Sequence, residues 1–357
     1  MKRLINNIIC GVLIVTSMFL FACGTPGVVE EGPITQRAVV ESNDFSANDN
    51  YAEFLSKAKT DFIVPALGEG LVPQGMDVAE ENDLIFISGY FKSYDKHPSS
   101  MIVTVDGKTG KLNGYYYVKN SNGNYNKGHL GGIAVTSKNI FIADGGKLSR
   151  IPLAQLQTVK SGEALSVVEE IKMPVTAAYC NYSNGMLWVG DFYLNGKYET
   201  RDYHDGVFIE NKYYSAWMVG YKLDSTTESE FSTQAWNSES TVAVPDCVLA
   251  TTERIQGAAV IDGKVVLSQS YGRTNNSTIL VYDLALDGEA QTTVTIDGKE
   301  IPTWALKDAT NSYVAPPMSE GLAVYNNKVL ILFESAALTY MLEGAINPTD
   351  RVWSFDI

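Results

Sequence analysis

GLAVYNNKVLIL, residues 321–332, is the stretch that decides the fold, because its pattern recurs four more times along the chain. A short run that begins with glycine or alanine leads through a polar turn into a run of apolar residues. The other copies are GMDVAEENDLIFI at 75–87, GIAVTSKNIFIA at 132–143, AYCNYSNGMLWV at 178–189 and GAAVIDGKVVL at 257–267. Short apolar runs bounded by Gly, Asn and Asp are typical of β-hairpins. Hairpins of one design therefore recur.

A third apolar run follows each hairpin. These runs span residues 101–106, 148–153, 217–224, 279–284 and 351–356. The copies begin about 45 to 80 residues apart, close to the roughly 40–50 residues of a propeller blade with long loops added. Small residues at the start of the first strand suit a crowded axis on which several strands converge. We therefore predict an all-β chain that forms a single β-propeller of five blades.

The ring must also be closed, and the last copy ends at Ile357, directly after its third run. The run at 62–64, before the first copy, is the natural donor of a fourth strand. Pairing of the N- and C-terminal strands would remove unpaired edges that invite aggregation. Two alternatives stay open. A sixth blade could occupy the long gap after the third copy, where residues 191–214 could instead be an insertion. The irregular spacing also permits a β-sandwich or several small β domains.

The start of the chain has the features of an export signal. Two basic residues precede an almost wholly apolar stretch at 8–22, and Cys23 follows. Leu20, Ala22 and Cys23 resemble the lipobox of bacterial lipoproteins, which implies cleavage after residue 22 and acylation of Cys23, with palmitate among the lipids. An ordinary secretory peptide with an incidental cysteine is the alternative. We expect residues 1–22 to be a signal peptide and Cys23 to anchor the protein to a membrane of the cell envelope, outside the cytoplasm.

Three further segments are expected after the leader. Residues 23–48 are rich in Gly, Pro, Ser, Asn and Glu and lack periodicity, which favours a flexible tether. Residues 49–60 place their apolar side chains on one helical face and predict a short helix. Residues 61–357 carry the strand and turn pattern and are assigned to the propeller domain.

Charge and cysteine content limit the partners. The chain has 41 acidic against 27 basic residues and a formal net charge of −14, so it should repel nucleic acid. Cys180 aligns with small residues of the other copies, so we interpret it as a buried substitute for one of them. A disulfide between Cys180 and Cys247 stays an alternative, since exported proteins can form such bonds.

Three of the repeats resemble a known group of propellers. The segments are QGMDV at 74–78, QGAAV at 256–260 and EGLAV at 320–324. They are similar to repeats of bacterial extracytoplasmic β-propellers in the broad group that includes TolB-like and regucalcin-like (gluconolactonase) proteins. The resemblance implies a propeller fold. It implies no single activity, because the group includes enzymes, binding proteins and scaffolds.

The blade geometry selects candidate site residues. The loop that enters the innermost strand and the loop that leaves the second strand emerge on the same face, beside the central channel. The entering loops hold Gln74, His129, Gln256 and Glu320, and the leaving loops hold Tyr90, Asp144, Asp191, Tyr271, Arg273 and Glu334. We expect these side chains to form one polar mouth that binds a small molecule, a glycan or an envelope protein.

Two functions are compatible with this mouth. The sequence has no recognisable nucleophile, phosphate-loop or zinc motif, which favours a binding module over an enzyme. The alternative is a metal-dependent lactonase or hydrolase, in which Asp144, Asp191, Glu320 and Glu334 would hold Ca²⁺, and it requires at least three of these acids around one point. Dense aromatic residues at 192–217 could stack on sugar rings, contact a partner or pack the insertion onto its blade.

Overall fold

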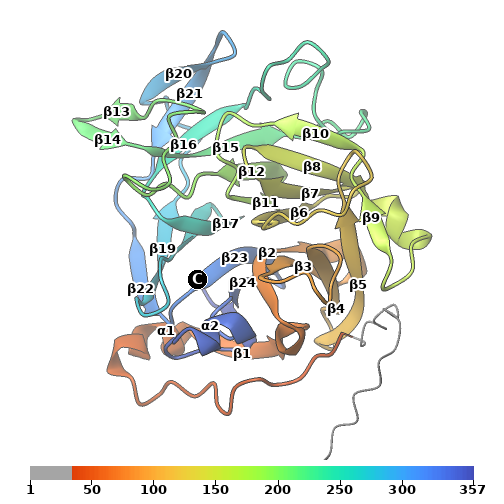
Figure 1. Cartoon of the computed structure of the whole chain (residues 1–357). Helices are drawn as coiled ribbons and strands as arrows, with labels where there is room; N and C mark the ends of the chain where they lie inside the picture. The colour runs from red at the N-terminus through yellow and green to blue at the C-terminus, as the bar shows by residue number, and fades with distance from the viewer. Residues whose placement is uncertain (1–33) are drawn as a thin grey trace, which may run out of the picture. The chain divides into compact units, whose positions relative to one another are not determined.

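The recurring hairpins form the inner halves of five blades in the computed structural model, which describes residues 34–357 (Figure 1). The inner strands are β2 (Leu71–Ala79), β6 (Gly132–Val135), β11 (Tyr179–Ser183), β17 (Ile255–Ile261) and β23 (Ser319–Tyr325). They pair with the second strands β3 (Leu84–Phe91), β7 (Asn139–Asp144), β12 (Met186–Gly190), β18 (Lys264–Gln269) and β24 (Lys328–Phe333). The prediction of a five-bladed β-propeller is thus confirmed.

Each blade is completed by a third and a fourth antiparallel strand. The third strands are β4 (Met101–Asp106), β8 (Lys147–Pro152), β15 (Ala216–Lys222), β19 (Ser277–Asp283) and β25 (Arg351–Phe355). The fourth strands are β5 (Lys111–Lys119), β10 (Glu169–Lys172), β16 (Cys247–Thr251), β22 (Asn311–Ala315) and β1 (Ala58–Ile63). Every third apolar run of the sequence therefore corresponds to the third strand of a blade.

Additional strands decorate the first and third blades. Strand β9 (Ala164–Ser166) pairs in parallel with β5, and the hairpin of β20 (Thr292–Ile296) and β21 (Lys299–Ala305) joins β16, also in parallel. Strands β13 (Val207–Ile209) and β14 (Lys212–Tyr214) form a separate hairpin between β12 and β15. Residues 191–214 are accordingly an insertion, and the described residues contain neither a sixth blade nor a sandwich.

Strand β1 closes the ring by pairing with β25, with Ala58 opposite Phe355 and Thr60 opposite Trp353. The predicted donor run was 62–64, and the strand begins four residues earlier. The helical segment before it consists of a 3₁₀ turn at Asp49–Tyr51 and α1 (Ala52–Lys57). Residues 58–60, which were expected to extend this helix, are extended because β25 offers them ladder hydrogen bonds.

Residues 34–48 lie against the propeller, contrary to the expectation that the flexible tether reaches residue 48. The Gln36 amide donates to the carbonyls of Ile63 and Gly110, at 2.6 and 2.7 Å, and its oxygen accepts from Leu112 N. The Phe45 ring stacks on Trp353 with centroids 5.9 Å apart. These contacts could not be predicted from the composition of the segment, because each one involves a residue far away in the sequence. No helix of the described part is long and apolar enough to cross a membrane.

Glycines let the inner strands converge on the axis, as their position in the repeats predicted. A Cβ atom on Gly75 would lie 2.5 Å from Ile133 N of the next blade, and one on Gly321 would lie 2.6 Å from Met76 N. Real side chains do not approach backbone atoms so closely. The five inner strands surround the centre of the ring in Figure 1. A residue without a side chain is therefore required at this contact in four blades, whereas β11 of the third blade has no glycine.

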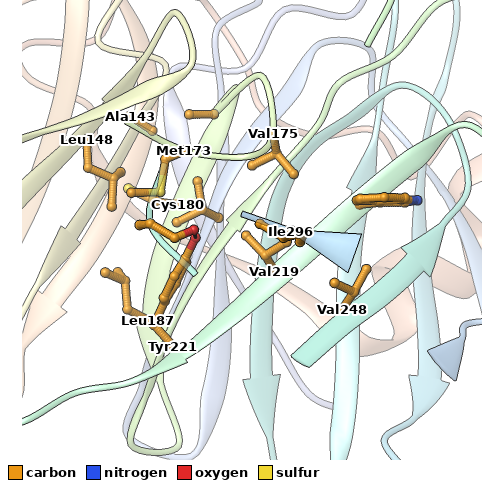
Figure 2. Packing of buried hydrophobic residues seen from close by; sticks show 14 of the residues in the cluster. Ala143, Leu148, Met173, Val175, Cys180, Leu187, Val219, Tyr221, Val248 and Ile296 are labelled. Atoms are coloured by element: carbon orange, nitrogen blue, oxygen red, sulfur yellow. Dashed lines mark hydrogen bonds between the residues drawn. The ribbon is translucent and has the colours of Figure 1, made fainter. Parts of the chain in front are cut away.

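The core consists of clusters between neighbouring blades. Successive side chains of β24 alternate between two of them, with Val329 and Ile331 facing the fourth blade and Leu330 facing the first. Figure 2 shows the cluster between the second and third blades, which includes Cys180. Cys180 and Cys247 are both free thiols in different clusters, so the alternative of a disulfide between them is wrong.

Candidate functional site

A cavity of about 920 Å³ opens where the entering and leaving loops of all five blades meet. Every mouth residue expected from the blade geometry lines it except Asp191. The lining residues from that set are Gln74, Tyr90, His129, Asp144, Gln256, Tyr271, Arg273, Glu320 and Glu334. A concave site of this size matches the usual volume of small-molecule pockets.

Two buried glutamates from the fifth blade form part of the cavity wall. Glu320 on β23 is 2% exposed and Glu334, directly after β24, is 8% exposed. The Gln256 amide donates to Glu320 Oε1 and the Gln74 amide donates to Glu334 Oε2, both at 2.8 Å. The two carboxyls are also hydrogen-bonded to each other, which requires that one of them carries a proton.

Burial determines how this pair ionises. It raises the pKa of Glu334 to about 7 and raises the pKa of Glu320 well above its ordinary value, with the nearby charge of Glu334 adding to the latter effect. Hydrogen bonds from Gln74 and Gln256 act in the opposite direction without overcoming burial. At neutral pH the pair therefore carries about one negative charge at most and retains a proton.

Aromatic side chains form two groups in the lining. The Tyr90 ring stacks on His129 with centroids 4.2 Å apart, and its hydroxyl lies 2.8 Å from the hydroxyl of Tyr340 in α2 (Leu338–Leu342). In the second group Phe192 packs against Tyr198 and Tyr271, with centroids 5.5 and 6.0 Å apart. The aromatics of the insertion thus both pack the loop and line the cavity.

The cationic side chains of the lining have partners, although the buried Nε of Arg273 has none in the described part of the chain. Lys197 Nζ donates to the hydroxyl of Tyr271 at 2.9 Å and lies over the rings of Tyr198 and Tyr271. Arg273 forms an ion pair with Glu343 and lies 5.0 Å from the centroid of the Tyr340 ring. Among the lining acids, Asp144 and Asp202 form no ion pair with any described residue.

Comparisons with known proteins identify no family for this chain. No protein-family profile matches the sequence, and no curated protein matches it. Among solved structures, the chain is similar to hydrazine synthase of Kuenenia stuttgartiensis (TM-score 0.34, 11% identity, 73% of this chain and 55% of that one). It is also similar to glutaminyl cyclase of Myxococcus xanthus, with a TM-score of 0.38 and 9% identity over 84% of this chain and 94% of that one. A putative glucose dehydrogenase of Thermus thermophilus matches with a TM-score of 0.36 and 11% identity over 84% of this chain and 99% of that one. These scores carry no argument about activity, and the propeller assignment rests on the sheet topology of the chain itself.

Asp191 does not belong to the cavity, contrary to expectation. It is fully buried, and its carboxylate accepts from Thr176 N at 2.7 Å, Trp217 N at 2.8 Å and His204 Nε2 at 2.8 Å. The His204 ring stacks on Trp217, with centroids 3.7 Å apart. Asp191 therefore fixes the start of the insertion, and His204, which no sequence motif singled out, is its partner.

The metal site of the alternative function is not formed by the described residues. Asp191 has its oxygens occupied by backbone and histidine donors, and no group of three or more His, Cys, Asp or Glu side chains in residues 34–357 is arranged to hold a metal ion. Only Glu320 and Glu334 of the four predicted ligands are in contact with each other. The lactonase alternative required three acids around one point, so its Ca²⁺ site is not supported by these residues.

The backbone at the mouth is unusual in four blades. In each of these blades, a non-glycine residue with positive φ lies one or two residues before the inner strand, which is β6, β11, β17 or β23. These residues are Leu130 (φ 51°), Ala177 (φ 49°), Arg254 (φ 62°) and Met318 (φ 65°). Such conformations cost about 1–3 kcal/mol each and cluster at ligand sites. Positive φ also occurs in the hairpin turns at the other end of the inner strands, at Asp83, Asn184, Asp262 and Asn326, where Asp and Asn adopt it more readily.

Proposed function

We propose that the protein is a cell-envelope lipoprotein whose propeller binds a small ligand in the cavity at its mouth. The observation that carries the proposal is the pair Glu320 and Glu334, two buried carboxyls that line a cavity of about 920 Å³ and receive only one glutamine donor each. Such groups weaken a fold unless something else uses them. Binding accounts for their place in the cavity wall, and no group of three or more His, Cys, Asp or Glu side chains in residues 34–357 is arranged to hold a metal ion.

Filling the cavity should abolish this binding. Ala178 lines the cavity and is small, so Ala178→Trp places an indole in the ligand's space. We expect ligands found by ligand-observed NMR in a library of saccharides, amines and short peptides to bind one per chain and to lose at least about tenfold in affinity in this variant. Ala285→Trp, at an exposed position outside the cavity, is the matched control. Ligands that bind Ala178→Trp as well as the control would show that binding occurs elsewhere.

The membrane anchor is tested separately. Cys23→Ala removes the acylated thiol, so cells that express this variant should incorporate no palmitate analogue into the protein and should release it into the soluble fraction. Wild-type protein should be labelled and remain with the membranes. Cys247→Ala is the control, because that thiol is buried and free. Equal labelling of wild type and Cys23→Ala would remove the lipoprotein assignment.

A further inference from the structure

We infer, building on the proposed function, that the cavity takes small ligands that carry an ammonium group, and that this group docks on Glu320 and Glu334. The first step of the argument is the hydrogen-bond inventory of the pair. A carboxylate offers about four acceptor sites, whereas the protein supplies Glu320 and Glu334 with one glutamine N–H each in addition to their mutual contact. The buried pair therefore lacks donors, and an ammonium group supplies three.

The charge of the lining favours the same class of ligand. Asp202 of the insertion and Asp144 of the second blade add carboxyl groups to the pair, whereas Glu199 forms an ion pair with Arg201. Arg273 is paired with Glu343, whereas Lys197 donates to the neutral hydroxyl of Tyr271 and keeps its positive charge, so the acids outnumber the unpaired cations of the lining. A ligand carboxylate or phosphate would meet unbalanced negative charge near the pair, whereas a cation would complete its neutralisation.

The aromatic rings of the lining are suited to cations. The protein's own cationic groups already lie over three of them, with Lys197 over Tyr198 and Tyr271 and Arg273 over Tyr340, at 5.0–5.4 Å from the ring centroids. Rings that attract these groups would attract a ligand ammonium in the same way. A neutral sugar would use the rings by stacking, yet it would leave the negative charge of the pair unpaired.

Docking of a cation on the pair makes binding depend on pH. Burial raises the pKa of Glu334 to about 7, so the pair gains its negative charge between about pH 6 and 8. The charged and titratable groups that interact with it are Lys92, Arg273, Tyr90 and Tyr340, and His129 stacks on Tyr90 in the same wall; burial raises the pKa of both tyrosines further above this interval. We expect an ammonium ligand to bind about tenfold more tightly at pH 8 than at pH 6 and to release up to about one proton at pH 6.

Matched ligand pairs test the inference by isothermal titration calorimetry on the full-length protein in detergent. Cadaverine is compared with 1,5-pentanediol and glucosamine with glucose, because the members of each pair differ only in amine against hydroxyl. We expect the amines to bind and the alcohols to bind at least about tenfold more weakly. Glu334→Gln should remove the preference, while Glu239→Gln in an exposed loop should keep it. Melting temperatures of both variants show whether each is folded.

The outcomes separate this inference from the proposed function. Amines that fail to bind, or that bind no better than their alcohols, overturn the inference. An amine preference that persists in folded Glu334→Gln, or that does not change with pH, would show that the ammonium group does not bind to Glu320 and Glu334. Saccharide binding that Ala178→Trp abolishes would leave the cavity as a binding site while excluding ammonium as its ligand class.

Discussion

Gly75→Val is expected to destabilise the propeller by about 3 kcal/mol or more, because the new side chain has no space at the axis. A Cβ atom at this position would lie 2.5 Å from Ile133 N and 2.7 Å from Gly132 C. Both are backbone atoms of the neighbouring inner strand, so no side-chain rotation can relieve the contact. The two blades would have to separate, and the ring has no free edge on which to absorb the movement.

Urea unfolding measures this effect, with Gly288→Val as the matched control. Gly288 is exposed, has no atom within 4 Å of its Cβ position and lies outside the regular strands. The midpoint of Gly75→Val should fall far below wild type, while that of Gly288→Val should change by less than about 0.5 kcal/mol in free energy of unfolding. Equal midpoints for the two variants would mean that the inner strands are not packed at the axis as described.

The free energy of unfolding is expected to fall as the pH rises from about 5 to 9. Burial raises the pKa of Asp77 to about 8, that of Glu334 to about 7, and that of Glu320 well above its ordinary value. Their protons are held by the folded state and released on unfolding, so the stability that they contribute is complete at acidic pH and is lost as pH rises through the folded pKa values. The rise from 4.5 to about 7 for Glu334 corresponds to about 3 kcal/mol.

Glu320→Gln isolates the part of this pH dependence that comes from the cavity. The amide cannot ionise and leaves Glu334 without a neighbouring carboxyl, so the variant should be more stable than wild type at pH 8 and its stability should vary less between pH 5 and 9. Asp77 accepts hydrogen bonds from Val135 N, Tyr182 N and Asn181 at the axis, and its contribution should remain in that variant. A stability that rises over this range would contradict the raised pKa values.

Repetition explains why the fold could be predicted. The hairpin pattern fixes strand order within each blade, and the glycines at 75, 132, 257 and 321 fix which strand lies at the axis. Strand order and a four-stranded blade then determine which loops share a face. The mouth residues Gln74, His129, Gln256 and Glu320 followed from that geometry without knowledge of any contact.

The features of the site that the sequence did not predict depend on contacts between distant residues, which no local pattern encodes. Asp191 stands at an equivalent loop position but is turned inward by His204 and two backbone donors. Tyr340 comes from α2, in a connection between β24 and β25 that has no repeat character, yet it lines the cavity beside Tyr90. The left-handed conformation of Leu130 could not be foreseen either, since leucine rarely adopts it.

The most direct test of the site is a pH titration of the glutamate side chains by NMR, with [5-¹³C]glutamate in the full-length protein and resonances assigned through Glu320→Gln and Glu334→Gln. We predict one carboxyl that titrates near pH 7, a second that keeps its proton to higher pH, and a downward shift of the first midpoint when cadaverine is present. Glutamate resonances that all titrate below about pH 5 and ignore cadaverine would contradict a buried, proton-sharing pair as the ligand-binding point of the cavity.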